Sequence, residues 1–159
     1  MSRAFVDESA SESREGDAPE LKIPLPPGAK NYVTPQGAER TRAELEQLLA
    51  VAQPRLREVE RRIEYLTRMT AIMEVVTPGD TPPERVVFGA TVTVMEKGHG
   101  KRTYRIVGVD ESDPSHGQVS WVSPIARALM GRKPGDAVTV ALPGGESLLS
   151  IVSVSRPPA

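Results

Sequence analysis

The sequence of 159 residues contains no cysteine, few aromatic residues and only 2 histidines. The absence of cysteine excludes disulfide bonds, cysteine-ligated zinc sites and thiol catalysis. Aromatic residues make up 4% of the chain, so the core must be built from Val, Leu, Ile and Met. With so few histidines a transition-metal site made of protein ligands alone is not expected, and we predict no cofactor.

An excess of charge of one sign is also missing, because 20 basic and 21 acidic residues leave a formal net charge of −1. Counterion release from nucleic acid needs a basic surface, so we expect no strong sequence-specific nucleic-acid binding. The chain has no apolar run long enough to span a membrane, and its N-terminus does not resemble a secretory signal. These absences predict a cytoplasmic protein with no membrane partner.

Composition divides the chain into four parts. Residues 1–30 are rich in Ser, Glu and Asp and then in proline, which predicts a disordered tail. Residues 34–76 are predicted to be helical, 77–84 to be a Pro-rich linker, and 85–156 to be rich in strands. The expected fold class is α+β, with a short antiparallel helical hairpin followed by an antiparallel β domain that contains one short helix.

Each predicted helix of the hairpin carries an apolar seam. Thr34 is the expected N-cap and Pro35 the first helical residue, while Pro54 ends the first helix and can begin the second. Apolar or small residues recur at spacings of three and four, as in a coiled coil. The seam residues are Thr41, Leu45, Leu48 and Ala52, then Leu56, Val59, Ile63, Leu66, Thr70 and Met73. Facing seams predict antiparallel packing across a very short connection.

Charged residues crowd the rest of the second helix. Most are expected to be solvated, with i,i+4 ion pairs between Glu58 and Arg62 and between Glu64 and Arg68. An alternative is that three arginines lying near one another on the helix line a negatively charged channel. These three are Arg57, Arg61 and Arg68.

The β-rich part contains one helical segment and several turns. Ser123 is the expected cap of this helix, Pro124 opens it and Gly131 closes it. Gly98-x-Gly100 is not followed by a helix, so it does not form a phosphate-binding loop. The acidic residues at 110, 111 and 113 have the carboxylates that Mg²⁺ prefers, but a polar turn is the simpler interpretation.

Four motifs follow one another between residues 84 and 155, namely VFGATVTV, YRIVGVDESD, SPIARALMGRKPGD and LPGGE. In this order they closely resemble the C-terminal domain of the Gre transcription elongation factors. Upstream, YVTPQGAERTRAELEQL and PRLREVERRIEYLTR are similar to parts of the two coiled-coil helices of that family. The resemblance implies an FKBP-like fold for the C-terminal domain and bacterial RNA polymerase as the partner.

The resemblance also implies a mechanism and a binding surface. In the family, the C-terminal domain holds the rim of the polymerase secondary channel, and the coiled coil reaches down that channel. Acidic residues at its tip help hold a Mg²⁺ that activates water for cleavage of backtracked RNA. Carried over to this chain, the residues facing polymerase are Ser123, Pro124, Ile125 and Arg127, with Asp110 and Glu111 as supports.

The sequence departs from the family pattern at the tip. Only Ala50-Val51-Ala52-Gln53 lies between Leu49 and Pro54, so the acidic segment is missing. Roughly two dozen absent residues, shared between two helices at 1.5 Å per residue, shorten the hairpin by about 20 Å. This resembles the short branch of the family called regulators of nucleoside diphosphate kinase. It predicts a monomeric polymerase-binding regulator that is not an enzyme and does not stimulate cleavage.

Two other functions remain open at this point. One is genuine stimulation of transcript cleavage by an active Gre-type factor. The other is peptidyl-prolyl isomerase activity, which only the expected fold suggests, and folds do not fix function. The few aromatic residues of the C-terminal part make the second less favourable. They are Phe88, Tyr104 and Trp121.

Overall fold

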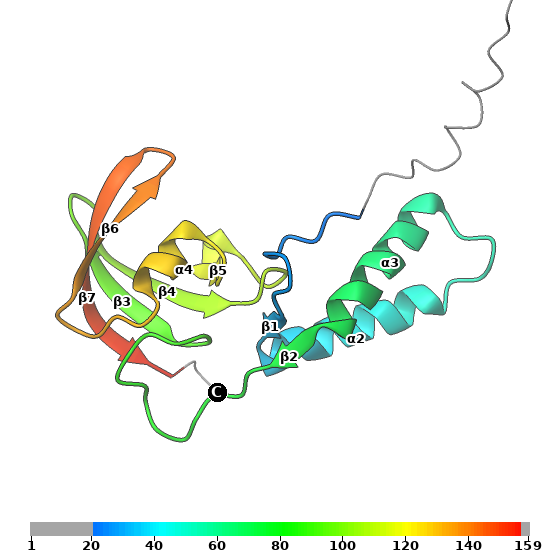
Figure 1. The fold of residues 1–159 in the computed structure, drawn as a ribbon, viewed down its shortest axis with the longest axis horizontal. Helices are drawn as coiled ribbons and strands as arrows, with labels where there is room; N and C mark the ends of the chain where they lie inside the picture. The colour runs from blue at the N-terminus through cyan, green and yellow to red at the C-terminus, as the bar shows by residue number, and fades with distance from the viewer. Residues whose placement is uncertain (1–20, 157–159) are drawn as a thin grey trace, which may run out of the picture.

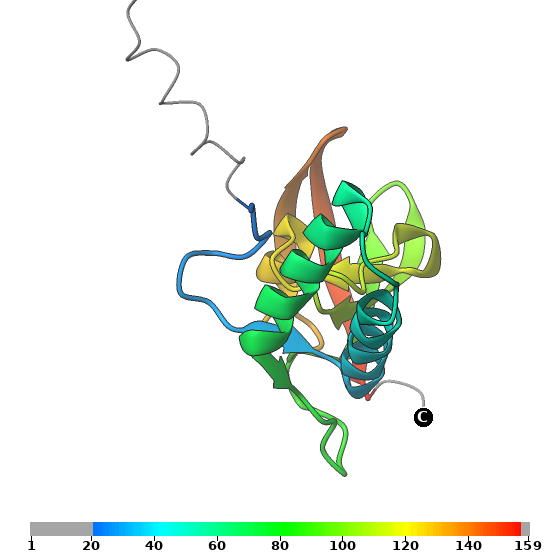
Figure 2. The ribbon, with the colours of Figure 1, turned by 90° about the vertical axis from the view of Figure 1, so that its right-hand side faces the viewer.

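In the computed structural model, which describes residues 21–156, a helical hairpin stands beside a curved β domain (Figure 1). The hairpin part contains β1 (Asn31–Val33), α2 (Pro35–Leu49), α3 (Arg57–Ala71) and β2 (Met73–Val75). Seen after a quarter turn, the two helices lie in front of the sheet (Figure 2). No helix among the described residues is both long and apolar enough to cross a bilayer.

The predicted tail falls partly outside the described residues, which begin at position 21. Residues 21–30 contain neither helix nor strand, and the Ala29 N–H donates to the Pro26 carbonyl at 3.0 Å in a turn. The predicted linker, residues 77–84, likewise forms neither helix nor strand.

The start of α2 agrees with the predicted cap. The Thr34 hydroxyl accepts a hydrogen bond from the Gly37 N–H at 3.1 Å, and Pro35 occupies the first turn. This arrangement satisfies one of the free N–H groups at the helix end, and proline there loses no backbone hydrogen bond.

The connection between the helices is longer than predicted. Pro54 does not begin α3, which starts at Arg57, so Ala52 and Leu56 lie in the connection and are exposed. The physical reason is Arg55, whose guanidinium donates hydrogen bonds to carbonyl groups at and just after the end of α2. It donates to Val51 at 3.0 Å and to Leu49 at 3.0 Å, which stabilises a loop in place of further helix.

The seams face each other along most of α2 and α3. Leu66 of the seam is fully buried, with 1% of its surface exposed, and so is Met69, at 0%, which was not predicted to belong to the seam. The other helical seam residues are partly buried, namely Thr41, Leu45, Leu48, Val59, Ile63 and Thr70. The predicted antiparallel hairpin is therefore present, although its packing ends before the tip.

Residues 73–75 were predicted to be helical, and this was wrong, because they form β2 and pair in parallel with β1. Asn31 pairs with Met73 and Val33 with Val75. The Asn31 N–H donates to the Ile72 carbonyl at 2.8 Å, and its side chain donates to the Met69 carbonyl at 3.1 Å. These bonds satisfy carbonyls at the end of α3 and turn the chain into an extended strand.

The β domain is a five-stranded sheet in the order β5-β4-β3-β7-β6. Its strands are β3 (Thr91–Glu96), β4 (Gly100–Val107), β5 (Gln118–Ser120), β6 (Ala137–Leu142) and β7 (Gly145–Ser155). Neighbouring strands are antiparallel except β4 and β5, which are parallel. This parallel pair was not foreseen. A short 3-10 helix (Pro114–His116) lies in the connection between its strands.

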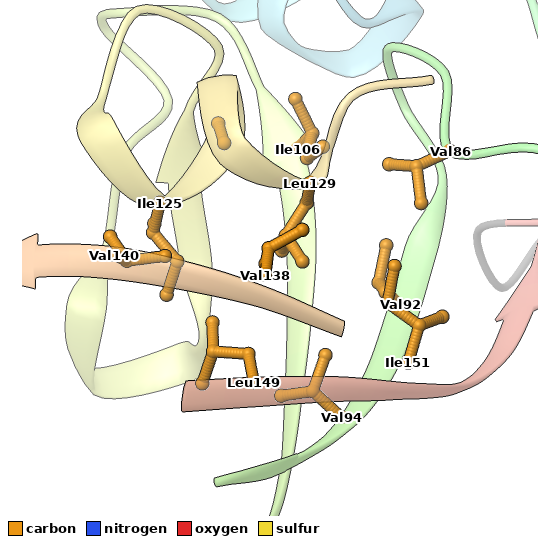
Figure 3. Packing of buried hydrophobic residues seen from close by; sticks show 11 residues of the cluster. Val86, Val92, Val94, Ile106, Ile125, Leu129, Val138, Val140, Leu149 and Ile151 are labelled. Carbon is orange, nitrogen blue, oxygen red and sulfur yellow. The ribbon is translucent and has the colours of Figure 1, made fainter. Parts of the chain in front are cut away.

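The short helix α4 (Pro124–Leu129) packs on one face of this sheet. Ile125, Ala126 and Leu129 point inward and meet alternate residues of the strands (Figure 3). The strand residues of this core are Val92, Val94, Ile106, Val138, Val140, Leu149 and Ile151, with Val86 at its edge. A core of aliphatic side chains is what the scarcity of aromatic residues predicted.

Candidate functional site

The start of α4 presents a small exposed face. The Ser123 hydroxyl accepts from the Ala126 N–H at 3.3 Å, which confirms the predicted cap. Pro124 and Arg127 are exposed, and their spacing of three places them on one side of the helix. Ile125 differs from the prediction, because its side chain is 7% exposed and belongs to the core. Ile125 therefore positions α4 and offers little surface to a partner.

The acidic turn after β4 lies at the same end of the sheet as Ser123. The parallel pairing of β4 with β5 brings both strands to a common carboxyl end, where the Trp121 N–H donates to the Val107 carbonyl at 3.0 Å. The turn closes when the Glu111 N–H donates to the Gly108 carbonyl at 3.0 Å. The acidic turn that follows β4 and the segment that leads from β5 to Ser123 therefore leave the sheet at neighbouring positions.

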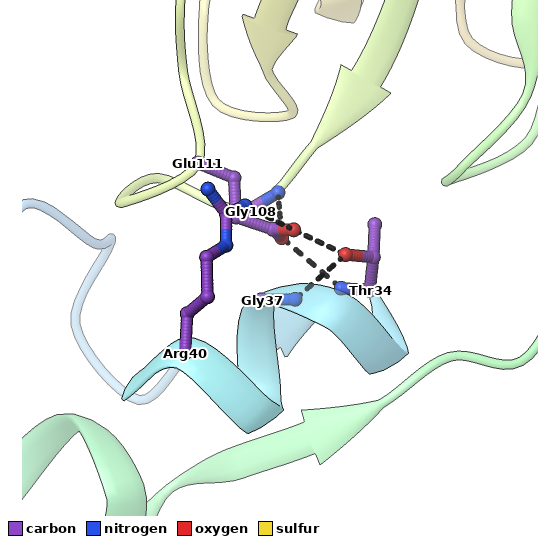
Figure 4. A network of polar contacts seen from close by, with 5 residues as sticks. All are labelled: Thr34, Gly37, Arg40, Gly108 and Glu111. Atoms are coloured by element: carbon purple, nitrogen blue, oxygen red, sulfur yellow. Dashed lines mark hydrogen bonds and ion pairs between the residues drawn. The ribbon is translucent and has the colours of Figure 1, made fainter. Parts of the chain in front are cut away.

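Glu111 itself faces the hairpin and is only 7% exposed (Figure 4). Its Oε2 accepts from the N–H groups of Thr34 at 3.0 Å and Gly108 at 2.9 Å, and its Oε1 accepts from the Thr34 hydroxyl. Arg40 Nη2 lies 3.7 Å from Oε1. Both oxygens of this buried carboxylate therefore accept hydrogen bonds from within the protein. Glu111 joins the β domain to the first turn of α2.

Two glycines make room for this carboxylate. A Cβ at Gly37 would overlap the carboxylate carbon of Glu111. A Cβ at Gly108 would lie 2.8 Å from Glu111 Oε2 and 2.7 Å from the Tyr32 carbonyl oxygen. The sequence pattern showed Glu111 only as a turn residue. The glycine at 37, next to a helix cap, is the one local signal that another group approaches closely.

Further contacts join the same two parts. The Tyr65 hydroxyl on α3 donates to Asp110 at 2.7 Å. Burial, together with this hydrogen bond, raises the pKa of Tyr65 above its usual value. The Tyr32 ring on β1 packs edge-on against Trp121, with centroids 5.3 Å apart. Asp110 and Glu111 thus support the arrangement of the hairpin against the domain.

The three arginines proposed to line a channel all lie on α3 and are exposed. Arg68 forms the predicted pair with Glu64 at 3.4 Å. Arg57 and Arg61 make no ion pair with the described residues. Their spacing leaves all three on one side of α3, which is a basic stripe facing solvent.

The predicted pair between Glu58 and Arg62 is absent, and Arg62 instead bonds Glu44 on α2 at 2.7 and 3.1 Å. The two-pronged contact of a guanidinium with a carboxylate is stronger than a flexible pair within one helix. The Arg62 hydrogen bond lowers the pKa of Glu44 below its ordinary value.

Arg62→Gln is expected to raise the pKa of the Glu44 carboxyl toward its ordinary value, because the largest cause of its lowering is removed. NMR titration of the side-chain carboxyl measures this directly. Arg68→Gln is the matched control, since Arg68 pairs with Glu64 and should leave Glu44 unchanged. Because the Glu44 pKa is depressed in the folded state, the pair stabilises the hairpin above the unfolded pKa and less as pH falls. An unchanged Glu44 titration in Arg62→Gln would contradict the assignment.

The tip of the hairpin, residues 50–56, contains no acidic residue. Apolar side chains are exposed on and beside it, with Leu49 at 51%, Val51 at 42% and Leu56 at 71%. A tip of this composition has no carboxylate with which to hold a metal ion.

Comparisons of the sequence with known proteins identify one family. Residues 81–156 match the family model described as "Transcription elongation factor, GreA/GreB, C-term". The chain is 35% identical to transcription elongation factor GreB of Pseudomonas aeruginosa, with 80% of this chain and 91% of that one covered. It is 39% identical to GreA of Alkalilimnicola ehrlichii, with 79% and 98% covered. A solved GreA/GreB structure from Nitrosomonas europaea is 26% identical, covers 80% of this chain and 99% of that one, and has a TM-score of 0.42.

Within the aligned region, the Pseudomonas relative contains residues that this chain lacks. The alignment with the Pseudomonas relative spans 153 residues but covers only 80% of this 159-residue chain. Gaps on the side of this chain therefore total roughly two dozen positions. That shortfall agrees in size with the segment expected to be missing between Leu49 and Pro54.

Proposed function

We propose that this chain, which belongs to the GreA/GreB family of transcription elongation factors, binds bacterial RNA polymerase as a regulator. Binding would take place at the rim of the secondary channel through the C-terminal domain. The observation that carries this proposal is the exposed face of α4, on which Pro124 and Arg127 stand beside the cap at Ser123. A proline presents a rigid contact, and an arginine can form two-pronged bonds with a carboxylate.

We further propose that the protein does not stimulate transcript cleavage. Each helix of the hairpin has 15 residues, which corresponds to a length of about 22 Å. The tip carries exposed apolar side chains and the partly buried guanidinium of Arg55 in place of carboxylates. A short hairpin without acidic ligands would occupy the channel entrance and compete with longer factors. The short-coiled-coil branch called regulators of nucleoside diphosphate kinase remains the predicted placement within the family.

Adding the protein to stalled, backtracked polymerase complexes is expected to release no short 3′ RNA fragments. In the same assay it should reduce the cleavage stimulated by a full-length Gre factor, as a competitor for one site. Resolving labelled RNA on a denaturing gel measures both effects. Robust cleavage by the protein alone would overturn the proposal, and undiminished cleavage by the full-length factor would argue against a shared site.

Arg127→Glu is expected to weaken polymerase binding about tenfold or more, because it reverses the charge at the centre of the proposed contact. Lys101→Glu makes the same change at an exposed position on β4, outside this face, and should bind like the wild type. Pro124→Ala tests the neighbouring contact without altering charge. Retention by immobilised polymerase measures all three, and equal retention of Arg127→Glu and wild type would rule out this surface.

A further inference from the structure

A cavity of about 170 Å³ lies where the hairpin base, the linker and the sheet meet. The hairpin contributes Thr34 and Val76, the linker contributes two of its prolines, and the β domain contributes Phe88 and Arg105. Arg156, just after β7, also lines the cavity and donates to the carbonyls of Gly79 and Asp80 at 2.8 and 2.7 Å. The cavity is thus formed by three segments that are far apart in the sequence.

The walls of this cavity combine apolar surface with positive charge. Val87, Phe88 and three prolines supply apolar surface, and no aspartate or glutamate side chain lines the cavity. The only charged residues among its lining are Arg105 and Arg156. An isolated positive charge against a low-polarity wall favours a negatively charged group.

Arg105 is one of the two charged residues that line the cavity. Its Nε is buried and has no hydrogen-bond partner among the described residues. A buried donor of this kind is normally satisfied, so the unpartnered Nε of Arg105 marks a place where an acceptor oxygen of a ligand fits.

We propose that this cavity binds a small organic anion whose carboxylate or phosphate group meets Arg105 and whose apolar part lies against Phe88 and the linker prolines. Cavities of about 150 Å³ admit a benzene-sized molecule, so the apolar part is about one ring. The bound anion would hold the linker and the base of the hairpin against the sheet. It would therefore stabilise one orientation of the hairpin. This inference does not depend on how the protein binds polymerase.

The test is an NMR titration of the ¹⁵N-labelled full chain with benzoate and with phenyl phosphate. Saturable shifts are expected at amides that surround the cavity, such as Val76, Gly79 and Arg105. Benzyl alcohol lacks the charge, and inorganic phosphate lacks the apolar part. Each should bind at least about tenfold more weakly than the preferred organic anion. The tighter of the two organic anions identifies the preferred head group. Equal binding of benzyl alcohol, or no shifts at millimolar anion, overturns the proposal.

Variants locate the binding group. Arg105→Gln should weaken binding of the preferred anion about tenfold. Arg102→Gln, on the same strand but outside the cavity, should bind like the wild type. Val87→Glu adds a negative charge at a lining position that is 47% exposed, so it tests the site even if Arg105→Gln fails to fold. Unchanged affinity in the folded variants of Arg105 or Val87 would contradict the site.

Discussion

Glu111→Ala is expected to release the hairpin from the β domain and to lower the free energy of unfolding by about 2–4 kcal/mol. The substitution leaves the N–H groups of Thr34 and Gly108 without the carboxylate that now accepts from both. Each buried donor left without a partner costs about 1–3 kcal/mol, and the helix cap loses its second partner as well. Urea denaturation followed by circular dichroism measures the change.

Trp121 gives a second, local measure of the same substitution. It is the only tryptophan, and its ring contacts Tyr32 of β1 edge-on. Release of the hairpin exposes this ring to water, so the emission of Glu111→Ala should shift to longer wavelength before global unfolding. A general loss of stability without such a shift would show that Glu111 acts within the β domain alone.

Three further variants serve as controls for this network. Glu111→Gln keeps the shape and one acceptor oxygen, and it should lose less stability than Glu111→Ala. Gly37→Ala should reproduce much of the loss from the other side, because its Cβ would overlap the carboxylate. Glu46→Ala removes an exposed carboxylate from the same helix and should change the free energy of unfolding by about 0.5 kcal/mol or less. Similar effects of all four would contradict a specific role for Glu111.

Leu149→Ala is expected to lower the free energy of unfolding by about 2–5 kcal/mol, the range for deleting a buried leucine side chain. Leu149 is 0% exposed on β7 and packs among the side chains between the sheet and α4. Truncation leaves a cavity that neighbouring strands, fixed by their hydrogen-bond ladders, can fill only in part.

Leu148 offers a matched control because it is the preceding residue on the same strand and is 42% exposed. Successive side chains of a strand point to opposite faces, so Leu148→Ala removes the same atoms from the outer face. Its cost should be about 1 kcal/mol or less. Urea midpoints compare the two directly, and equal losses would contradict the assigned facing of β7.

The sequence predicted those parts of the fold that local chemistry controls. Thr34-Pro35 and Ser123-Pro124 mark helix starts because a cap residue and a proline satisfy or remove the free N–H groups there. Gly131 marks the end of α4 because it adopts a positive φ of 78°. Periodicity also predicted the seam positions that lie within α2 and α3, although not where the helices end.

Features that depend on distant partners could not be predicted in this way. Residues 73–75 continue a helical spacing, and only pairing with β1, about forty residues earlier, makes them a strand. Arg62 has an acceptable partner within its own helix, yet Glu44 on the neighbouring helix offers a two-pronged contact. In both cases a contact between segments overrides a local preference.

For the candidate site, too, the sequence indicated the segment but not the contacts of each side chain. Resemblance selected the start of α4, and the structure places Pro124 and Arg127 on its exposed side. The inward position of Ile125 follows from its packing on the sheet, which the motif alone did not reveal. The role of Glu111 was missed because its hydrogen-bond partner Thr34 is 77 residues away.

The parallel pairing of β1 with β2 ties together the entry and exit of the hairpin. Everything between these strands is a loop in the topological sense, because its two ends are fixed side by side whatever its length. Whole turns can then be added to or removed from both helices without moving the anchor beneath them. The length of the hairpin is in this sense independent of the way in which its base is anchored. A change in the length of the hairpin therefore need not alter the structure of the β domain.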